Sequence, residues 1–102
     1  MKFTNKLMKV PLKKAFNILD GRLSTSIDDV YEMLDFIFNT NLFTHQLPGA
    51  MNVLKEKNPK WFSDGVRLLD EIKRKHDTDD FVFLMDIIDK EYSQEEIIIE
   101  KL

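Results

Sequence analysis

The chain has 102 residues with a net charge of −3 at pH 7, and 43% of the residues are hydrophobic. This length and composition predict one folded domain and exclude a disordered polar chain. The absence of cysteine excludes a disulfide scaffold and a thiolate metal site. With only three glycines and three prolines, an all-β fold with many tight turns is also disfavoured.

The charge is distributed unevenly along the chain. Of the 15 basic residues, five lie in the first 19 positions, where there is no acid, so the later residues hold 10 basic and 18 acidic side chains, a balance of −8. The basic segment could bind nucleic acid or an acidic partner, or it could be a solvated helix face beside a frayed terminus. Its lysines are Lys2, Lys6, Lys9, Lys13 and Lys14.

Apolar residues recur at helical spacing along most of the chain. Residues at i, i+3, i+4 and i+7 lie on one side of a 3.6-residue helix, which must be buried against another element. Repeated stripes of this kind predict that helices dominate the fold. The stripes start at four places: Leu12, Ile27, Leu47 and Phe81.

Capping residues predict where the first two helices begin and end. The first is expected to start with Pro11, a favoured first helical residue, and to stop at Gly21. The second is expected over residues 27–39. Ser26 is its predicted N-cap, and Asp29 stands where the acid of a capping box belongs.

Two further helices are predicted in the middle of the chain. Thr44 is the expected N-cap of the third, which should reach about Lys57. The fourth should cover roughly residues 60–75. Because glycine weakens a helix by about 1 kcal/mol relative to alanine, Gly65 predicts a later start for this helix, near Ser63.

The last part of the chain predicts a fifth helix and a strand. The helix should run over residues 81–92, with Asp77 or Thr78 as its cap, and it is apolar on almost all sides. Such a helix is typical of a buried bundle centre or of an oligomer contact. The β-branched segment 96–100 indicates a strand, and the region of Phe3 is its expected partner.

Three polar residues near helix ends are candidates for a functional role. His45 and Gln46 lie at the expected start of the third helix, and Arg22 follows the end of the first. Histidine can act as a general base near neutral pH, although no serine or cysteine motif accompanies it. His45 could equally fix the turn before the helix. An enzyme built on His45 and Arg22 would need a pocket between the first and third helices.

The second helix carries an acidic face that surrounds an aromatic residue. By helical phase Phe36 falls among acids, and an exposed aromatic of this kind is a candidate anchor for a partner protein. The alternative is a helix buried on two sides, with Met33 and Phe36 packing against a neighbour. Together with the polar candidates, the predicted partner-binding residues are Asp28, Glu32, Asp35, Phe36, Arg22, His45 and Gln46.

The sequence contains no recognisable signal for a membrane, a metal or a cofactor. No apolar run approaches the roughly 18 residues of a membrane span, and no secretory signal is present. His76 and the acids that follow it lack the spacing of a calcium loop, so we interpret those acids as helix caps. Without a glycine-rich phosphate loop, nucleotide use is not indicated either. We expect a soluble, cytoplasmic protein that needs no metal or cofactor.

Two segments of the chain resemble sequences of a known family. Gly21-Arg22-Leu23 and Leu42-Phe43-Thr44-His45-Gln46-Leu47-Pro48 flank the pair Val30-Tyr31. In this combination, roughly residues 9–54 resemble a family of small uncharacterised proteins encoded by bacteriophages and prophages. That family usually has arginine after the proline, where Gly49 stands here. The resemblance implies a phage accessory protein with no established reaction.

The sequence therefore predicts a mainly α domain, a compact bundle of about five helices with a short two-stranded β pair joining the terminal segments. We expect a non-enzymatic accessory protein that acts by protein–protein interaction, for which inhibition of a host defence protein is one form. One alternative is a nucleic-acid-binding protein that uses the lysine-rich N-terminus. A second alternative is a structural subunit of a homo-oligomer.

Overall fold

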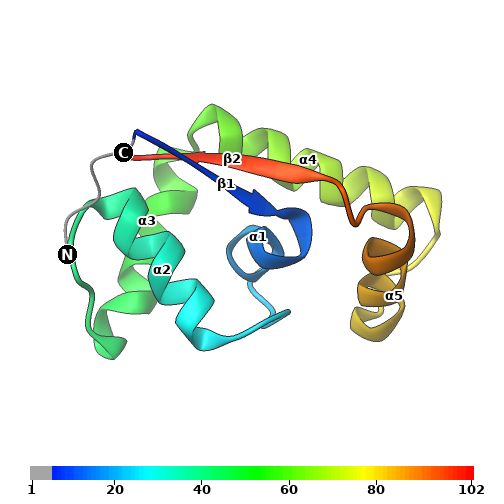
Figure 1. The fold of residues 1–102 in the computed structure, drawn as a ribbon, viewed down its shortest axis with the longest axis horizontal. Coiled ribbons are helices and arrows are strands. Elements are labelled where there is room, and N and C mark those ends of the chain that lie inside the picture. The colour runs from blue at the N-terminus through cyan, green and yellow to red at the C-terminus, as the bar shows by residue number, and fades with distance from the viewer. Residues whose placement is uncertain (1–5) are drawn as a thin grey trace.

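Residues 6–102, the part of the chain that the computed structural model describes, fold into five α-helices, one short 3-10 helix and a two-stranded sheet (Figure 1). In chain order, all the helices come after the first strand and before the second. This confirms the predicted fold class, a mainly α domain with a β pair. The elements in chain order are β1 (Leu7–Pro11), α1 (Leu12–Leu19), α2 (Ile27–Phe38), η1 (Thr44–Gln46), α3 (Leu47–Lys57), α4 (Lys60–Lys75), α5 (Phe81–Glu91) and β2 (Glu96–Glu100).

The sheet pairs β1 and β2 in antiparallel register. Val10 lies opposite Ile97, and Met8 lies opposite Ile99. Val10, Ile97 and Ile99 are buried, and Met8 packs partly against the same core. Since side chains alternate between the two faces of a strand, the intervening residues lie on the outer face. The sheet therefore closes one side of the helical core.

The junction between β1 and α1 corrects two predictions. The segment 96–100 is a strand as predicted, but its described partner is Leu7–Pro11, and Phe3 lies outside the described residues. Pro11 belongs to this strand and has an extended ψ of 148°, so α1 begins one residue later than expected, at Leu12. The Leu12 backbone N–H donates to the Glu95 carbonyl at 2.8 Å, which ties the start of the helix to β2.

Helix α1 lies at the centre of the hydrophobic core. It contacts α2, α4, α5 and both strands, and its stripe is fully buried as its periodicity predicts. Burying one large apolar side chain stabilises a fold by about 1.5–3 kcal/mol, so this stripe is a principal source of stability. Its inaccessible side chains are Leu12, Ala15, Phe16 and Ile18.

The predicted boundaries of α2 are confirmed to within one residue. The Ser26 hydroxyl accepts a hydrogen bond from the Asp29 backbone N–H at 3.3 Å, as an N-cap should. Asn39 ends the helix in the left-handed conformation, with φ of 53°, and is its cap rather than its last residue. Asn58 ends α3 in the same way, with φ of 45°.

Gly65 does not delay the start of α4, which begins at Lys60. A Cβ atom at this position would lie 2.8 Å from Leu19 Cδ2, closer than atoms in contact can approach. The glycine is buried and lets α4 pack closely on the end of α1. The prediction of a start near Ser63 was wrong because tertiary packing, not helix propensity, determines the residue here.

Helix α5 is not the buried centre that its composition predicts. Only Leu84 and Ile88 are buried, whereas Val82 is 75% exposed and Phe83 is 64% exposed. The helix lies at one end of the long axis of the molecule and packs against α1 on one side (Figure 1). Its N-cap is Asp80, whose carboxylate accepts from the Phe83 backbone N–H at 3.0 Å, rather than either expected residue, Asp77 or Thr78.

Candidate functional site

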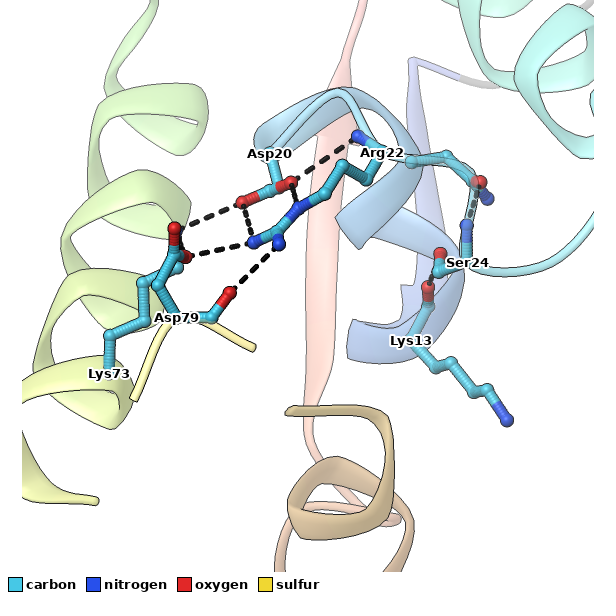
Figure 2. Close-up of polar contacts among 7 residues, drawn as sticks. Lys13, Asp20, Arg22, Ser24, Lys73 and Asp79 are labelled. Carbon is cyan, nitrogen blue, oxygen red and sulfur yellow. Dashed lines mark hydrogen bonds and ion pairs between the residues drawn. The ribbon is translucent and has the colours of Figure 1, made fainter. Parts of the chain in front are cut away.

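Arg22 belongs to a cluster of four charged residues that joins α1, α4 and the segment before α5 (Figure 2). Its Nε lies 2.7 Å from Asp20 Oδ1, and its Nη2 lies 2.9 Å from Asp79 Oδ1. Lys73 Nζ lies 2.9 Å from Asp20 Oδ2 and 3.2 Å from Asp79 Oδ1. Each cation thus contacts both carboxylates, and the cluster is closed on itself.

Within this cluster Asp20 is the most buried member, with a side chain that is only 7% exposed. Burial by itself raises the pKa of Asp20, but hydrogen bonds from Arg22 and Lys73 outweigh that effect and lower the pKa to about 2. The pKa of Asp79 is also lowered, first by its hydrogen bond with Lys73. The hydrogen bond with Asp20 raises the pKa of Arg22 further above its already high value.

Two aromatic rings flank the Arg22 guanidinium. Its Cζ lies 5.7 Å from the centroid of Phe16 and 5.8 Å from that of Phe81, and these two rings contact each other with centroids 5.9 Å apart. The Nη1 atom also donates to the Asp79 carbonyl at 2.8 Å. Arg22 therefore holds the end of α1 to the start of α5, and its donors are committed to the fold.

Most acids predicted as partner contacts on α2 have internal partners. Asp35 Oδ1 accepts from the Leu42 backbone N–H at 2.8 Å and fixes the chain after α2. Glu32 forms an ion pair with Lys14, and Asp28 lies exposed on the surface. Glu32 therefore joins α2 to α1, and Asp35 joins α2 to the segment that follows it.

Phe36 is buried, with 1% of its surface exposed, so its interpretation as an exposed anchor was wrong. The alternative interpretation is correct, because Met33 is fully buried as well and α2 packs on two sides. The Lys101 ammonium group lies 5.4 Å from the centroid of the Phe36 ring. The C-terminal segment, which follows β2, supplies this cover, and the periodicity of α2 alone contains no sign of it.

His45 and Gln46 lie in η1, the 3-10 turn that precedes α3. Gln46 Oε1 accepts from the Phe43 backbone N–H at 2.8 Å. The exposed His45 ring stacks on Phe43, with centroids 6.1 Å apart and an interplanar angle of 4°. Thr44, predicted to cap α3, begins this turn instead and hydrogen-bonds the Tyr31 hydroxyl of α2. The turn is thereby fixed against α2.

An apolar groove of about 350 Å³ lies between the α1–α2 loop, α2 and α3. Two of its large apolar side chains are about half exposed to solvent: Leu23 is 54% exposed and Ile27 is 49% exposed. Among the described residues, its lining includes no ionisable side chain. The lining consists of Asn17, Gly21, Leu23, Ile27, Val30, Leu47, Pro48 and Met51.

Asn17 fixes the loop that forms one wall of the groove. Its side chain, 4% exposed, donates from Nδ2 to the Lys14 carbonyl at 2.9 Å and to Thr25 Oγ1 at 2.6 Å. Its Oδ1 accepts from the backbone N–H groups of Ser24 at 2.8 Å and Thr25 at 3.3 Å. Ser24 Oγ in turn donates to the Lys13 carbonyl at 2.5 Å (Figure 2). All the hydrogen-bonding capacity of this amide is used by the loop.

The groove occupies the place that the enzyme hypothesis requires, between the first and third helices, but neither His45 nor Arg22 lines it. Four of the residues that line it, Ile27, Val30, Leu47 and Met51, belong to apolar stripes that periodicity assigned to buried helix faces. A signal for a surface role was present in the polar loop that interrupts the pattern, because Leu23 lies inside it, away from any helical stripe. Sequence reasoning selected the polar neighbours of the groove and missed its apolar walls.

The lysine-rich N-terminal segment is partly engaged in the fold. Lys13 lies 3.1 Å from Asp89 of α5, and Lys14 pairs with Glu32 of α2. Lys6 and Lys9 are exposed, and Lys2 lies outside the described residues. In residues 6–102, no three histidine, aspartate or glutamate side chains are arranged to hold a metal ion. Nor does any helix there combine the length and apolar character that crossing a membrane requires.

Comparison with known families places the groove within a recognised domain. The family model DUF7736, described as a domain of unknown function, matches residues 10–66. The chain belongs to this family. All the lining residues of the groove fall inside the DUF7736 segment, whereas α5, Lys73 and Asp79 lie beyond it. Neither a curated protein nor a solved structure matches the chain significantly.

Proposed function

We propose that this protein is a non-enzymatic accessory protein that binds another protein through the α1–α3 groove. The observation that carries the proposal is the groove itself, a recess of about 350 Å³ with half-exposed Leu23 and Ile27 in its walls. Exposed apolar residues in a recess typically mark a binding site. The expected partner is a protein segment that inserts apolar side chains into the groove.

The chemistry of the lining supports an apolar occupant. Its one polar side chain, Asn17, already uses its amide within the loop. A charged group that entered the groove would lose water without finding a partner among the described lining residues, which costs free energy. Burying the exposed halves of Leu23 and Ile27 would contribute about 1 kcal/mol each.

The walls of the groove also support binding because they are held in place. Asn17 fixes the α1–α2 loop, and the Tyr31–Thr44 hydrogen bond fixes η1 next to α3. A surface that is already ordered loses little conformational entropy when a partner docks. The polar residues predicted as contacts, Arg22 and Gln46, would then act by positioning the groove.

The resemblance of residues 9–54 to phage-encoded proteins makes a bacterial host protein the first partner to test. More specifically, we propose that binding inhibits that host protein. Small size and a preformed groove suit a protein that acts by occupying a surface of its target.

The experiment compares three tagged proteins: the wild type, the double variant Leu23→Ser/Ile27→Ser, and Val53→Ser. Val53 is 40% exposed on α3 but does not line the groove, so it is a matched apolar control. Each tagged protein is exposed to a lysate of the cell that carries its gene and to a lysate of a bacterial host, and the proteins that it retains are identified. Each retained protein is then purified, and its affinity for the three tagged proteins is measured by direct titration.

We expect a partner whose affinity falls at least about tenfold with the groove variant and is unchanged with Val53→Ser. Circular dichroism and urea denaturation verify that all three proteins are folded. Equal binding by the groove variant, or the absence of any directly titrated partner, would contradict the proposal.

A further inference from the structure

Helix α5 presents a second exposed apolar surface, at the opposite end of the long axis from α2 and α3 (Figure 1). Val82 is 75% exposed and Phe83 is 64% exposed, so two neighbouring residues of this helix leave most of their apolar surface in solvent. Phe83 and Ile87 border a hollow of about 440 Å³ that is completed by the segment 76–78. Two adjacent, highly exposed apolar side chains beside a recess form a candidate contact surface.

The segment that forms this surface, residues 76–92, is rich in acids. Residues 76–92 contain six carboxylates and one lysine. Asp79 and Asp89 pair with cations of other elements, and Asp86 pairs with Lys90. No lysine or arginine in residues 6–102 pairs with the other three acids, which are Asp77, Asp80 and Glu91.

We propose that the α5 face is a docking surface for a basic amphipathic segment of a second protein. Its apolar side chains would cover Val82 and Phe83 and enter the hollow beside Ile87. Its lysine or arginine residues would face Asp77, which lines the hollow itself and pairs with no lysine or arginine of residues 6–102. Apolar contact supplies affinity and the complementary charge orients the partner.

Charge decides between this partner and the other candidates. A second copy of the chain would bring the same excess of acid to the contact, and like charges facing each other oppose association. Nucleic acid is disfavoured for the same reason, because its phosphates would face carboxylates. The α5 surface is separate from the groove, so the inference stands or falls independently of the function proposed above.

The experiment uses the full chain and a synthetic peptide of about 14 residues, four helical turns of leucine and lysine with one apolar face. Binding is measured by calorimetry, and the contact is located by NMR shifts of backbone amides. A leucine–glutamate peptide of the same pattern controls for charge. The protein variants are Val82→Ser/Phe83→Ser, Asp77→Asn, and Val53→Ser as the matched control, since Val53 is exposed and lines neither recess.

We expect the basic peptide to shift amides of residues 76–92 and to bind at least about tenfold more weakly to Val82→Ser/Phe83→Ser. Asp77→Asn should weaken binding and flatten its salt dependence. Val53→Ser should bind as the wild type does.

Three results would overturn the inference. The first is equal affinity for the acidic peptide, and the second is undiminished binding by Val82→Ser/Phe83→Ser. The third is a monomer–dimer equilibrium in sedimentation that this variant abolishes, because a second copy would then cover the face.

Discussion

The groove and the α5 face both expose large apolar side chains, but they are built differently. In the groove, Leu23 and Ile27 stand in a recess whose described lining has no ionisable group and whose loop is fixed by Asn17. On α5, Val82 and Phe83 are exposed on a helix, and Phe83 borders a hollow that the carboxylate-bearing Asp77 also lines. The same residue types therefore predict different partners, because neighbouring charge and shape determine what can cover them.

The two regions also differ in their place in the chain, and one cluster joins them. The groove lies within the DUF7736 segment, whereas α5 lies beyond it. Asp20 and Arg22 come from the family segment, and Lys73 and Asp79 come from the remainder. We infer that this cluster holds α5 in a fixed position relative to the family domain. Three predictions test that division.

The largest effect is expected from a change in the groove loop that should leave α5 unaffected. Replacing Asn17 with alanine removes four hydrogen bonds from the α1–α2 loop, and unsatisfied buried groups cost about 1–3 kcal/mol. We expect urea denaturation to show a loss of that size, together with weaker binding at the groove. Binding of the basic peptide to α5 should be unchanged.

Asn52→Ala is the matched control, since Asn52 is exposed on α3. It should leave stability and both binding reactions unchanged. If Asn17→Ala weakened the two surfaces equally, the groove loop and α5 would not be independent.

The second prediction concerns acid stability and the joining cluster. The pKa of Asp20 is lowered from 3.8 to about 2, which corresponds to at most about 2 kcal/mol of stabilisation by its charged form. Because the folded pKa lies below the ordinary value, this stabilisation is fully present above pH 3.8 and is lost as the pH falls toward 2. Asp20→Asn should therefore destabilise the protein by about 1–2 kcal/mol at pH 7.

Urea denaturation at neutral pH, near pH 4 and near pH 2 measures this effect. The variant should lose less stability on acidification than the wild type does. The loss that remains comes from other carboxylates, including Asp79, whose pKa is also lowered. Asp70→Asn, at an exposed position of α4, is the control. An identical acid profile for wild type and Asp20→Asn would show that the cluster does not stabilise the fold.

The smallest effect on the free energy of unfolding is expected from substitutions on the α5 face. Val82→Ser/Phe83→Ser should change the free energy of unfolding by no more than about 0.5 kcal/mol, because both side chains are mostly exposed. Equilibrium urea denaturation with far-UV circular dichroism measures this directly. A loss above about 1 kcal/mol would mean that these side chains pack within the fold and are not free to bind a partner.

Most of the secondary structure followed from local sequence. The stripes that start at Leu12 and Ile27 form helices, Ser26 caps α2, and the segment 96–100 is a strand. These features depend on neighbours within a few residues, so periodicity and capping chemistry are sufficient to predict them. The cap of α5 was missed because Asp77, Thr78, Asp79 and Asp80 are all acceptable caps, and the choice of Asp80 depends on where the segment contacts Arg22.

Burial was harder to predict. The apolar stripe of each helix was expected to be buried, but the sequence did not show whether the opposite face of the helix is also covered. The sequence left Phe36 either as an exposed anchor or as part of a helix buried on two sides, and it is buried. It left the helix that bears Phe83 either as a buried bundle centre or as an oligomer contact, and that side chain is exposed. Helical phase gives the face on which a residue lies but not which faces have neighbours. Lys101, which lies over Phe36, is 65 positions away in the sequence.

The sequence by itself determined the five helices, the N-cap of α2 and the strand at 96–100, because each depends on short-range spacing and backbone hydrogen bonding. Only the tertiary structure decided that Arg22 is a clamp, that Gly65 is an inter-helix contact, and that Leu23 and Ile27 form a groove. Those roles depend on side chains brought together from distant parts of the chain, and no local pattern encodes which of them meet.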